Sequence, residues 1–207
     1  MNTRRLLIPI VFIVAGLTAA RPAAADPAQD AQTFITDFGH RAIDALTEKN
    51  LSDAELIKRF KTLFEEGFDV SYIARSALGR FWPRATDDEK AQYVPLFEDY
   101  VVTIYASQFR DYTGQGFTTK SAQVSADGVV TVFSDVMTSD GPPAKLEWII
   151  VNVDGKPKIR DVKIEGVSMI TTYRDQFANE ILQHDGKIVG LIDALREKTA
   201  TLHANNG

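Results

Sequence analysis

The chain has 207 residues, of which 44% are hydrophobic and 25% charged, proportions typical of one ordinary globular domain. It contains no cysteine, which excludes disulfide scaffolds, thiol catalysis, cysteine zinc sites and lipidation of a cysteine. Its net charge of −5 argues against nucleic acid as a partner, because binding phosphates requires clustered lysine and arginine.

The first 25 residues have the pattern of a secretory signal peptide. Arg4 and Arg5 give a basic start, residues 6–20 are apolar, and Ala23–Ala25 supply the small residues of a cleavage site. The apolar run is shorter than the roughly 20 residues that span a bilayer, which favours cleavage near Ala25 over a retained anchor. The pattern favours the general secretory route over a twin-arginine signal. Cleavage removes three arginines and leaves one domain, residues 26–207, with its net charge changed from −5 to −8.

The first part of this domain has helical periodicity. Apolar residues recur every three or four positions over residues 30–50, as in an amphipathic helix. The capping-box pattern of residues 52–55 predicts a second helix, and Asp69 is placed to cap a short third one. A second capping box, at residues 86–89, opens the longest periodic segment, in which Pro95 predicts either a kink or a new helix start.

The period then changes from 3.6 to 2. Four strand-like runs, separated by short turn signals, predict an antiparallel meander near residues 116–125, 129–138, 144–153 and 158–166. Helical periodicity returns after Gly166, and Ser168 is placed as a helix N-cap. Helices, then strands, then helices indicate an α+β fold.

The sequence shows no motif for catalysis, metals or cofactors. Residues 166–170 begin like a nucleophile elbow, but Ile170 stands where the second glycine belongs. We therefore expect no cofactor, no metal and no enzymatic activity. A small-molecule enzyme on an α+β domain remains the alternative, and it requires a buried Asp–Tyr or Asp–His constellation.

Two stretches resemble a known family. One runs from Ser76 to Trp82 (S-A-L-G-R-F-W), and the other from Asp161 to Ile170 (D-V-K-I-E-G-V-S-M-I), followed by Tyr173, Arg174 and Phe177. Together they resemble the MlaC family of periplasmic phospholipid-binding proteins, also called the toluene-tolerance auxiliary family, over about residues 30–198. A sister branch is associated with hopanoid biosynthesis.

The resemblance implies a fold and a function. The fold would be a helical layer wrapped on a four-stranded antiparallel sheet, a cone-shaped, NTF2-like architecture with an apolar cavity between the layers. The function would be that of a soluble periplasmic shuttle that contributes to lipid asymmetry of the outer membrane. Its ligand would be a phospholipid and its partners an outer-membrane lipoprotein complex and an inner-membrane ABC transporter, with the carrier itself a monomer.

If such a cavity exists, the apolar stripes of the helices and the alternation of side chains along the strands nominate twelve residues for its wall. They are Phe97, Val101, Ile104, Tyr105, Trp148, Ile150, Val162, Ile164, Val167, Met169, Tyr173 and Phe177. Arg174 and Arg80 are candidates for a headgroup phosphate. The competing interpretation of the same stripes is a solid packed core, as in an adaptor protein of an envelope complex.

Overall fold

The structure is a computed structural model that describes residues 26–109, 116–138 and 141–205. The predicted signal peptide lies outside these residues. Helices and one 3₁₀ turn precede the sheet: α1 (Pro27–Leu46), α2 (Asp53–Gly67), α3 (Val70–Leu78), η1 (Gly79–Arg84) and α4 (Asp87–Gln108). The sheet and two more helices follow: β1 (Phe117–Val124), β2 (Val130–Val136), β3 (Ala144–Val153), β4 (Lys156–Ile164), β5 (Val167–Ser168), α5 (Met169–Gln183) and α6 (Ile188–Asn205).

The predicted helix starts are confirmed by their caps. Ser52 Oγ accepts from the Glu55 backbone N–H at 3.3 Å, and Asp69 Oδ1 accepts from that of Tyr72 at 3.3 Å. At the start of α4, Glu89 Oε2 accepts from the Thr86 backbone N–H at 2.8 Å, and Thr86 Oγ1 accepts from the Glu89 backbone N–H at 3.1 Å. These two reciprocal bonds are those of a capping box. The helix then continues through Pro95 as one element.

The sheet is an antiparallel meander in the order β1-β2-β3-β4-β5, with five strands where four were expected. The extra strand arises because Glu165 and Gly166 both have positive φ, 49° and 80°. They form a two-residue turn that pairs Ile164 with Val167. Ser168 then ends this short strand and caps α5, accepting from the Thr171 N–H at 3.1 Å.

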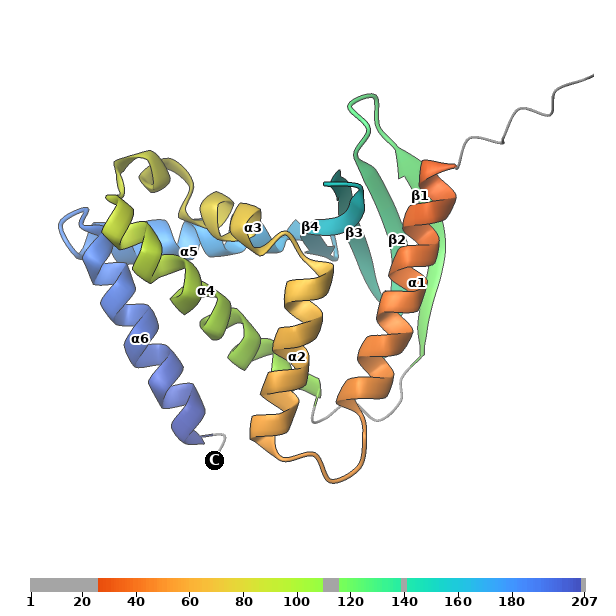
Figure 1. Cartoon of the computed structure of the whole chain (residues 1–207), viewed down its shortest axis with the longest axis horizontal. Coiled ribbons are helices and arrows are strands. Elements are labelled where there is room, and N and C mark those ends of the chain that lie inside the picture. Colours follow the sequence, from red (N-terminus) through yellow and green to blue (C-terminus); the bar gives the residue numbers. More distant parts are fainter. Residues whose placement is uncertain (1–25, 110–115, 139–140, 206–207) are drawn as a thin grey trace, which may run out of the picture.

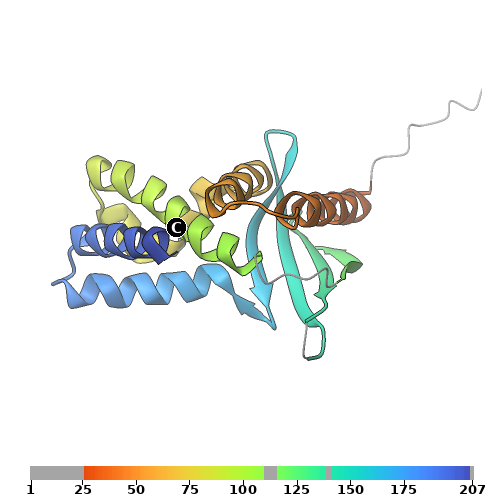
Figure 2. The same cartoon turned by 90° about the horizontal axis from the view of Figure 1, so that it is seen from below.

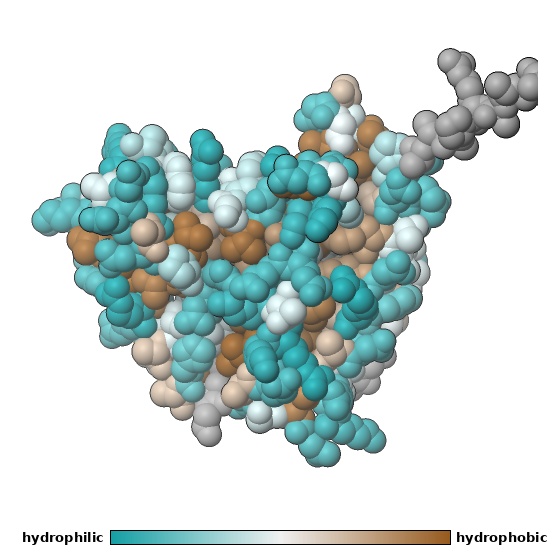
Figure 3. Space-filling view, in the orientation of Figure 1, coloured by the Kyte–Doolittle hydropathy of each residue, from teal (hydrophilic) through white to brown (hydrophobic). Residues whose placement is uncertain are grey.

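The helices divide into two groups around the sheet. Figures 1 and 2 show α1 lying along the sheet on one side of the molecule, and α3 to α6 gathered on the other, with α2 between them. Seen in the orientation of Figure 1, the surface is mostly hydrophilic and has smaller hydrophobic areas between its hydrophilic parts (Figure 3).

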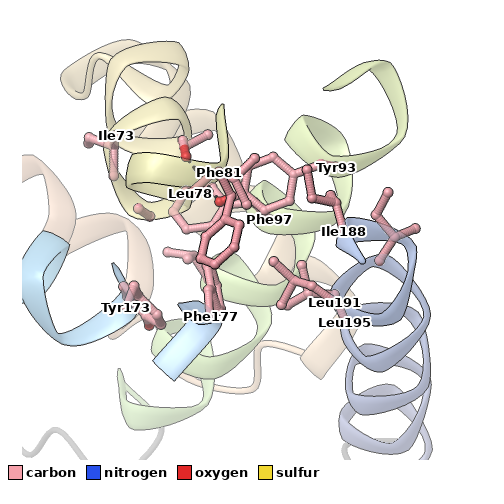
Figure 4. Close-up of a cluster of buried hydrophobic side chains, with 14 of the residues drawn as sticks. Ile73, Leu78, Phe81, Tyr93, Phe97, Tyr173, Phe177, Ile188, Leu191 and Leu195 are labelled. Carbon is pink, nitrogen blue, oxygen red and sulfur yellow. Dashed lines mark hydrogen bonds between the residues drawn. The ribbon is translucent and has the colours of Figure 1, made fainter. Parts of the chain in front are cut away.

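Buried side chains form two hydrophobic clusters that match this division. The helical core lies between α3, η1, α4, α5 and α6, and includes Tyr93, Phe97 and Phe177 (Figure 4). The helix–sheet core joins α1 and α2 to β2, β3 and β4, and includes Ile35 and Ile159. Each cluster buries apolar surface of its own, so the molecule is held together by two cores that meet at α2.

Candidate binding cavity

A cavity of about 320 Å³ lies where the two cores meet. Its wall combines α1 and α2, the start of α3, the second half of α4, the helix-facing side of β1 to β4, and the first turns of α5. Nearly all of these side chains are aliphatic or aromatic, which makes the cavity suited to an apolar ligand.

Eight of the twelve nominated residues line this cavity. These residues lie on regular faces of α4, β3, β4 and α5 that turn toward the cavity, as periodicity predicts for helices and strands. They are Phe97, Val101, Tyr105, Trp148, Val162, Ile164, Met169 and Tyr173.

The other four nominated residues lie elsewhere. Phe177 is 4% exposed in the helical core, because it follows Tyr173 by one turn of α5 and contacts the rings of Tyr93 and Phe97 instead. Ile150 is 2% exposed in the helix–sheet core. Ile104 lines a separate surface hollow with residues of α6, and Val167 is 59% exposed at the β4–β5 turn.

The α1 and α2 side of the wall was not nominated from the sequence. Their amphipathic stripes were recognised, but nothing in a stripe shows that it faces a cavity instead of a packed core. These wall residues are Phe38, Gly39, Ala42, Ile43 and Leu46 of α1, Phe60, Leu63 and Phe64 of α2, and Phe68 just after it.

Two glycines allow aromatic rings to approach the helices closely on this side. A Cβ added at Gly39 would lie 2.4 Å from the Phe117 ring, and one added at Gly67 would lie 2.4 Å from the Phe38 ring. Both distances are far below contact, so only glycine fits without movement of the ring. Phe117 and Phe38 both line the cavity, and these glycines therefore help to set its width.

Three aromatic side chains of the wall use their polar atoms in hydrogen bonds within the protein. Tyr173 donates to Tyr105 at 3.3 Å, Tyr105 donates to Met169 Sδ at 3.8 Å, and Trp148 Nε1 donates to Ser134 Oγ at 2.8 Å. Burial raises the pKa of both tyrosines, so their hydroxyls stay neutral at ordinary pH.

Asp161 is the acidic side chain of the described wall, and it serves the start of α5. Its two oxygens accept from Ser168 Oγ at 2.6 Å and from the Ile170 N–H at 3.2 Å. It is thus engaged at a helix N-terminus, where a carboxylate is favourable, and not in the Asp–Tyr pair that the enzyme alternative requires. Within the described residues, no group of three or more His, Asp and Glu is placed to hold a metal ion.

The two arginines nominated for a phosphate do not line the cavity. Arg174 lies against Gly79, with its Cδ 2.9 Å from the position of an added Cβ, and Arg80 lies over the ring of Phe81. Arg160 of β4, which was not nominated, does line the cavity.

Comparison with known proteins decides the family. Residues 37–197 match the family model described as MlaC protein. The chain belongs to the MlaC family. This confirms the resemblance found in the sequence motifs.

The chain is also similar to two individual proteins. The toluene tolerance protein ttg2D of Pseudomonas putida is 22% identical over 126 residues, which are 60% of this chain and 59% of the relative. The chain therefore matches about three fifths of the length of this MlaC-family relative. A phospholipid-binding protein from Ralstonia solanacearum, solved in complex with a phospholipid, has the same fold with a TM-score of 0.71. It is 24% identical and the match covers 84% of this chain and 98% of that one.

Among the helices of residues 26–109, 116–138 and 141–205, none is both long and apolar enough to cross a membrane.

Proposed function

We propose that this MlaC-family protein is a lipid carrier that encloses the acyl chains of a phospholipid in the cavity between its two cores. The observation that carries the proposal is the almost entirely apolar wall of that cavity. Membership of the family and a structural neighbour that holds a phospholipid both support it.

The energetics of transport require such a wall. Burying one methylene group is worth about 0.8 kcal/mol, so about 30 methylenes in two acyl chains amount to roughly 25 kcal/mol. A lipid cannot leave a membrane at a useful rate unless a carrier replaces most of this burial. The headgroup can remain in water at the mouth of the cavity.

The cavity has a volume of about 320 Å³, and acyl chains that need more room would have to widen it. The boundary between the two cores is the natural place to widen, because Ile57, Phe60 and Phe68 contact both clusters and are only partly buried. We propose that lipid entry separates the cores along this boundary.

The cellular part of the proposal follows the family resemblance and the sequence. Residues 1–25 would direct export and be removed near Ala25, leaving residues 26–207 as a monomeric lipid-binding domain in the periplasm. There it would move phospholipid between an outer-membrane lipoprotein complex and an inner-membrane ABC transporter. The partners would set the direction, because a carrier in equilibrium with two membranes creates no gradient.

Native mass spectrometry of the mature protein, purified from periplasm without detergent, tests the proposal. We expect a mass excess equal to a phospholipid, and its value gives the number of acyl chains held. A hopanoid would instead assign the protein to the sister branch of the family. Protein that is lipid-free, and that extracts no lipid from added vesicles, would contradict the carrier function and favour the adaptor.

A further inference from the structure

Arg160 is a charged side chain in an apolar wall. Among the described residues that line the cavity, it is the one cation, and the one anion, Asp161, already has both oxygens engaged by the start of α5. A cation in such a wall costs free energy unless something offsets its desolvation. Burial against a ligand or a core accounts for the apolar wall residues, but it does not account for Arg160.

Arg160 lies at a β-bulge of β4. Asp161 pairs with Ile149 and Ile159 pairs with Ile150, so Arg160 is an extra residue with no partner across the ladder. Bulges re-aim a side chain and are frequent beside binding sites. Here Arg160 lies beside the bulge and has the same strand parity as the wall residues Val162 and Ile164, with which it lines the cavity.

Two neighbours hold the guanidinium in place. Arg160 Nε donates to Asp69 Oδ2 at 2.9 Å, and its Cζ lies 4.3 Å from the centre of the Tyr72 ring. Asp69 is fixed in turn, because its other oxygen caps α3 and its own N–H donates to the Ile159 carbonyl at 2.9 Å. The side chain of Arg160 is therefore oriented before any ligand arrives.

The terminal nitrogens of Arg160 remain available. Within the described part of the chain, neither Nη1 nor Nη2 makes a hydrogen bond or ion pair, and the side chain is 34% exposed. It thus lies at the rim, in contact with both the cavity and water. A planar fork with two free donors matches the geometry of two phosphate oxygens.

We propose that Arg160 binds the phosphate of the lipid headgroup while the acyl chains occupy the cavity. The proposal rests on the carrier function and adds a basis for selecting lipids that carry a phosphate. Asp69 and Tyr72 act as positioning residues for the guanidinium. The ligand chemistry is that of a phosphate oxyanion, which a free phosphate ion shares with a phospholipid.

A competition between two lipids with identical acyl chains tests this. The mature protein is incubated with vesicles that contain equal amounts of dipalmitoylphosphatidylglycerol and dipalmitoylglycerol, and native mass spectrometry gives the ratio of the two bound lipids. The wild type should favour the phospholipid. Arg160→Gln should lower the ratio roughly tenfold while total lipid uptake persists, as expected for loss of a charge-assisted pair. Arg160→Lys should fall between them, because lysine keeps the charge without the fork.

Matched variants separate this role from a structural one. Arg174→Gln and Arg80→Gln also remove an arginine, but outside the wall, and should leave the ratio unchanged. Asp69→Asn frees the guanidinium from its anchor and should lower the ratio less than Arg160→Gln does. If Arg160→Gln and Asp69→Asn lower the melting temperature but leave the lipid ratio at the wild-type value, Arg160 is only a structural ion pair and the proposal is wrong.

The remaining outcomes are also decisive. If the wild type takes up neither lipid, the carrier function itself fails, which the ratio alone would not reveal. Millimolar inorganic phosphate should lower the wild-type ratio and have no effect on Arg160→Gln. If phosphate raises the melting temperature of the lipid-free wild type through Arg160, yet the lipid ratio is the same in both proteins, the site recognises a free anion and the headgroup assignment is overturned.

Discussion

The two cores use similar side chains but differ in how completely they enclose them. In the helical core Phe97 and Tyr93 are fully buried, and Phe177 meets both rings edge-on at 6.0 and 6.2 Å. Among the described residues the helical core buries six aromatic side chains and the helix–sheet core only that of Phe38. The aromatic side chains packed against Phe38's cluster are partly buried, and two of them also contact the helical core: Phe34, Phe60, Phe68, Phe109, Phe117 and Trp148. The first core is a solid support, whereas the second has apolar surface left over. The cavity lies where that surplus surface meets the solid half.

The strongest way to break this comparison is to make a hole in the helical core. Phe177→Ala removes a ring that contacts Tyr93, Phe97 and Tyr173, and should lower the free energy of unfolding by about 3–5 kcal/mol. Lipid bound per folded molecule should not change, because Phe177 is not in the cavity wall. Denaturant unfolding and native mass spectrometry measure the two quantities.

Leu182→Ala is the control for this variant. Leu182 lies in the same helix but is 56% exposed, so its loss should cost less than about 0.5 kcal/mol. If Phe177→Ala proved equally mild, the helical core would be as adaptable as the other one, and the division into a solid and a deformable half would be wrong.

A charge placed in the wall should act on lipid binding more than on the fold. Val162→Asp introduces a carboxylate among apolar side chains, which must give up water when acyl chains enter. We expect lipid occupancy to fall at least tenfold, about 1.4 kcal/mol, with circular dichroism still showing a folded protein.

Val167→Asp is the matched control for that change. Val167 belongs to the same sheet but is 59% exposed outside the wall, so the same substitution should leave occupancy nearly unchanged. Equal losses in both variants would show that the wall extends around the β4–β5 turn, as sequence parity had suggested.

These two valines also show what the sequence can and cannot predict. Caps and turns are local, so residues 52, 69, 86 and 168 were assigned correctly from neighbouring residues alone. Parity predicts that Val162 and Val167 lie on the same wall, but only Val162 lines the cavity, because the two-residue turn at Glu165 and Gly166 lies between them.

Long-range relations were harder still. The stripe of α4 contains both Tyr105 and Ile104, yet one side chain faces the cavity and the other lies toward α6. The distance between two helices decides which part of a stripe packs against the neighbouring helix. The sequence of one helix alone does not determine that distance. Arg160 was missed for a different reason: it has the same strand parity as the nominated Val162 and Ile164, but only apolar side chains were nominated for the wall.

Alkaline pH should loosen the boundary between the cores. Burial raises the folded-state pKa of Tyr173 above the value near 10 of an unfolded tyrosine, while its hydroxyl is bonded to Tyr105. The stability from this group is therefore complete below about pH 10 and is lost as pH rises toward the folded pKa. In that range the free energy of unfolding should decrease by about 1.4 kcal/mol per pH unit.

Tyr173→Phe tests this assignment. The variant should remove the contribution of Tyr173 to the decrease in stability above pH 10. Tyr93 and Tyr105, whose pKa values are also raised by burial, should still contribute theirs. Urea unfolding measured between pH 8 and 11 gives both slopes. Identical slopes in wild type and variant would mean that Tyr173 is exposed to water in the lipid-free protein, and that the boundary is already open.

The smallest expected effect comes from filling the space at Gly39. Alanine there should gain up to about 1 kcal/mol of helix propensity but must push the Phe117 ring away, at an overpacking cost of about 1–3 kcal/mol. The net loss should be near 1 kcal/mol, and lipid uptake should fall because the displaced ring lines the cavity.

Gly116→Ala is the control beside the same ring, since its added Cβ would meet Met137 only at an ordinary 3.6 Å. Phe117→Leu in the Gly39→Ala background should restore stability, because the smaller side chain leaves room for the new methyl group. Gly39→Ala could instead be more stable than wild type and take up lipid normally. The Phe117 ring would then move without loss of stability, and the helix–sheet half would be more deformable than its packing indicates.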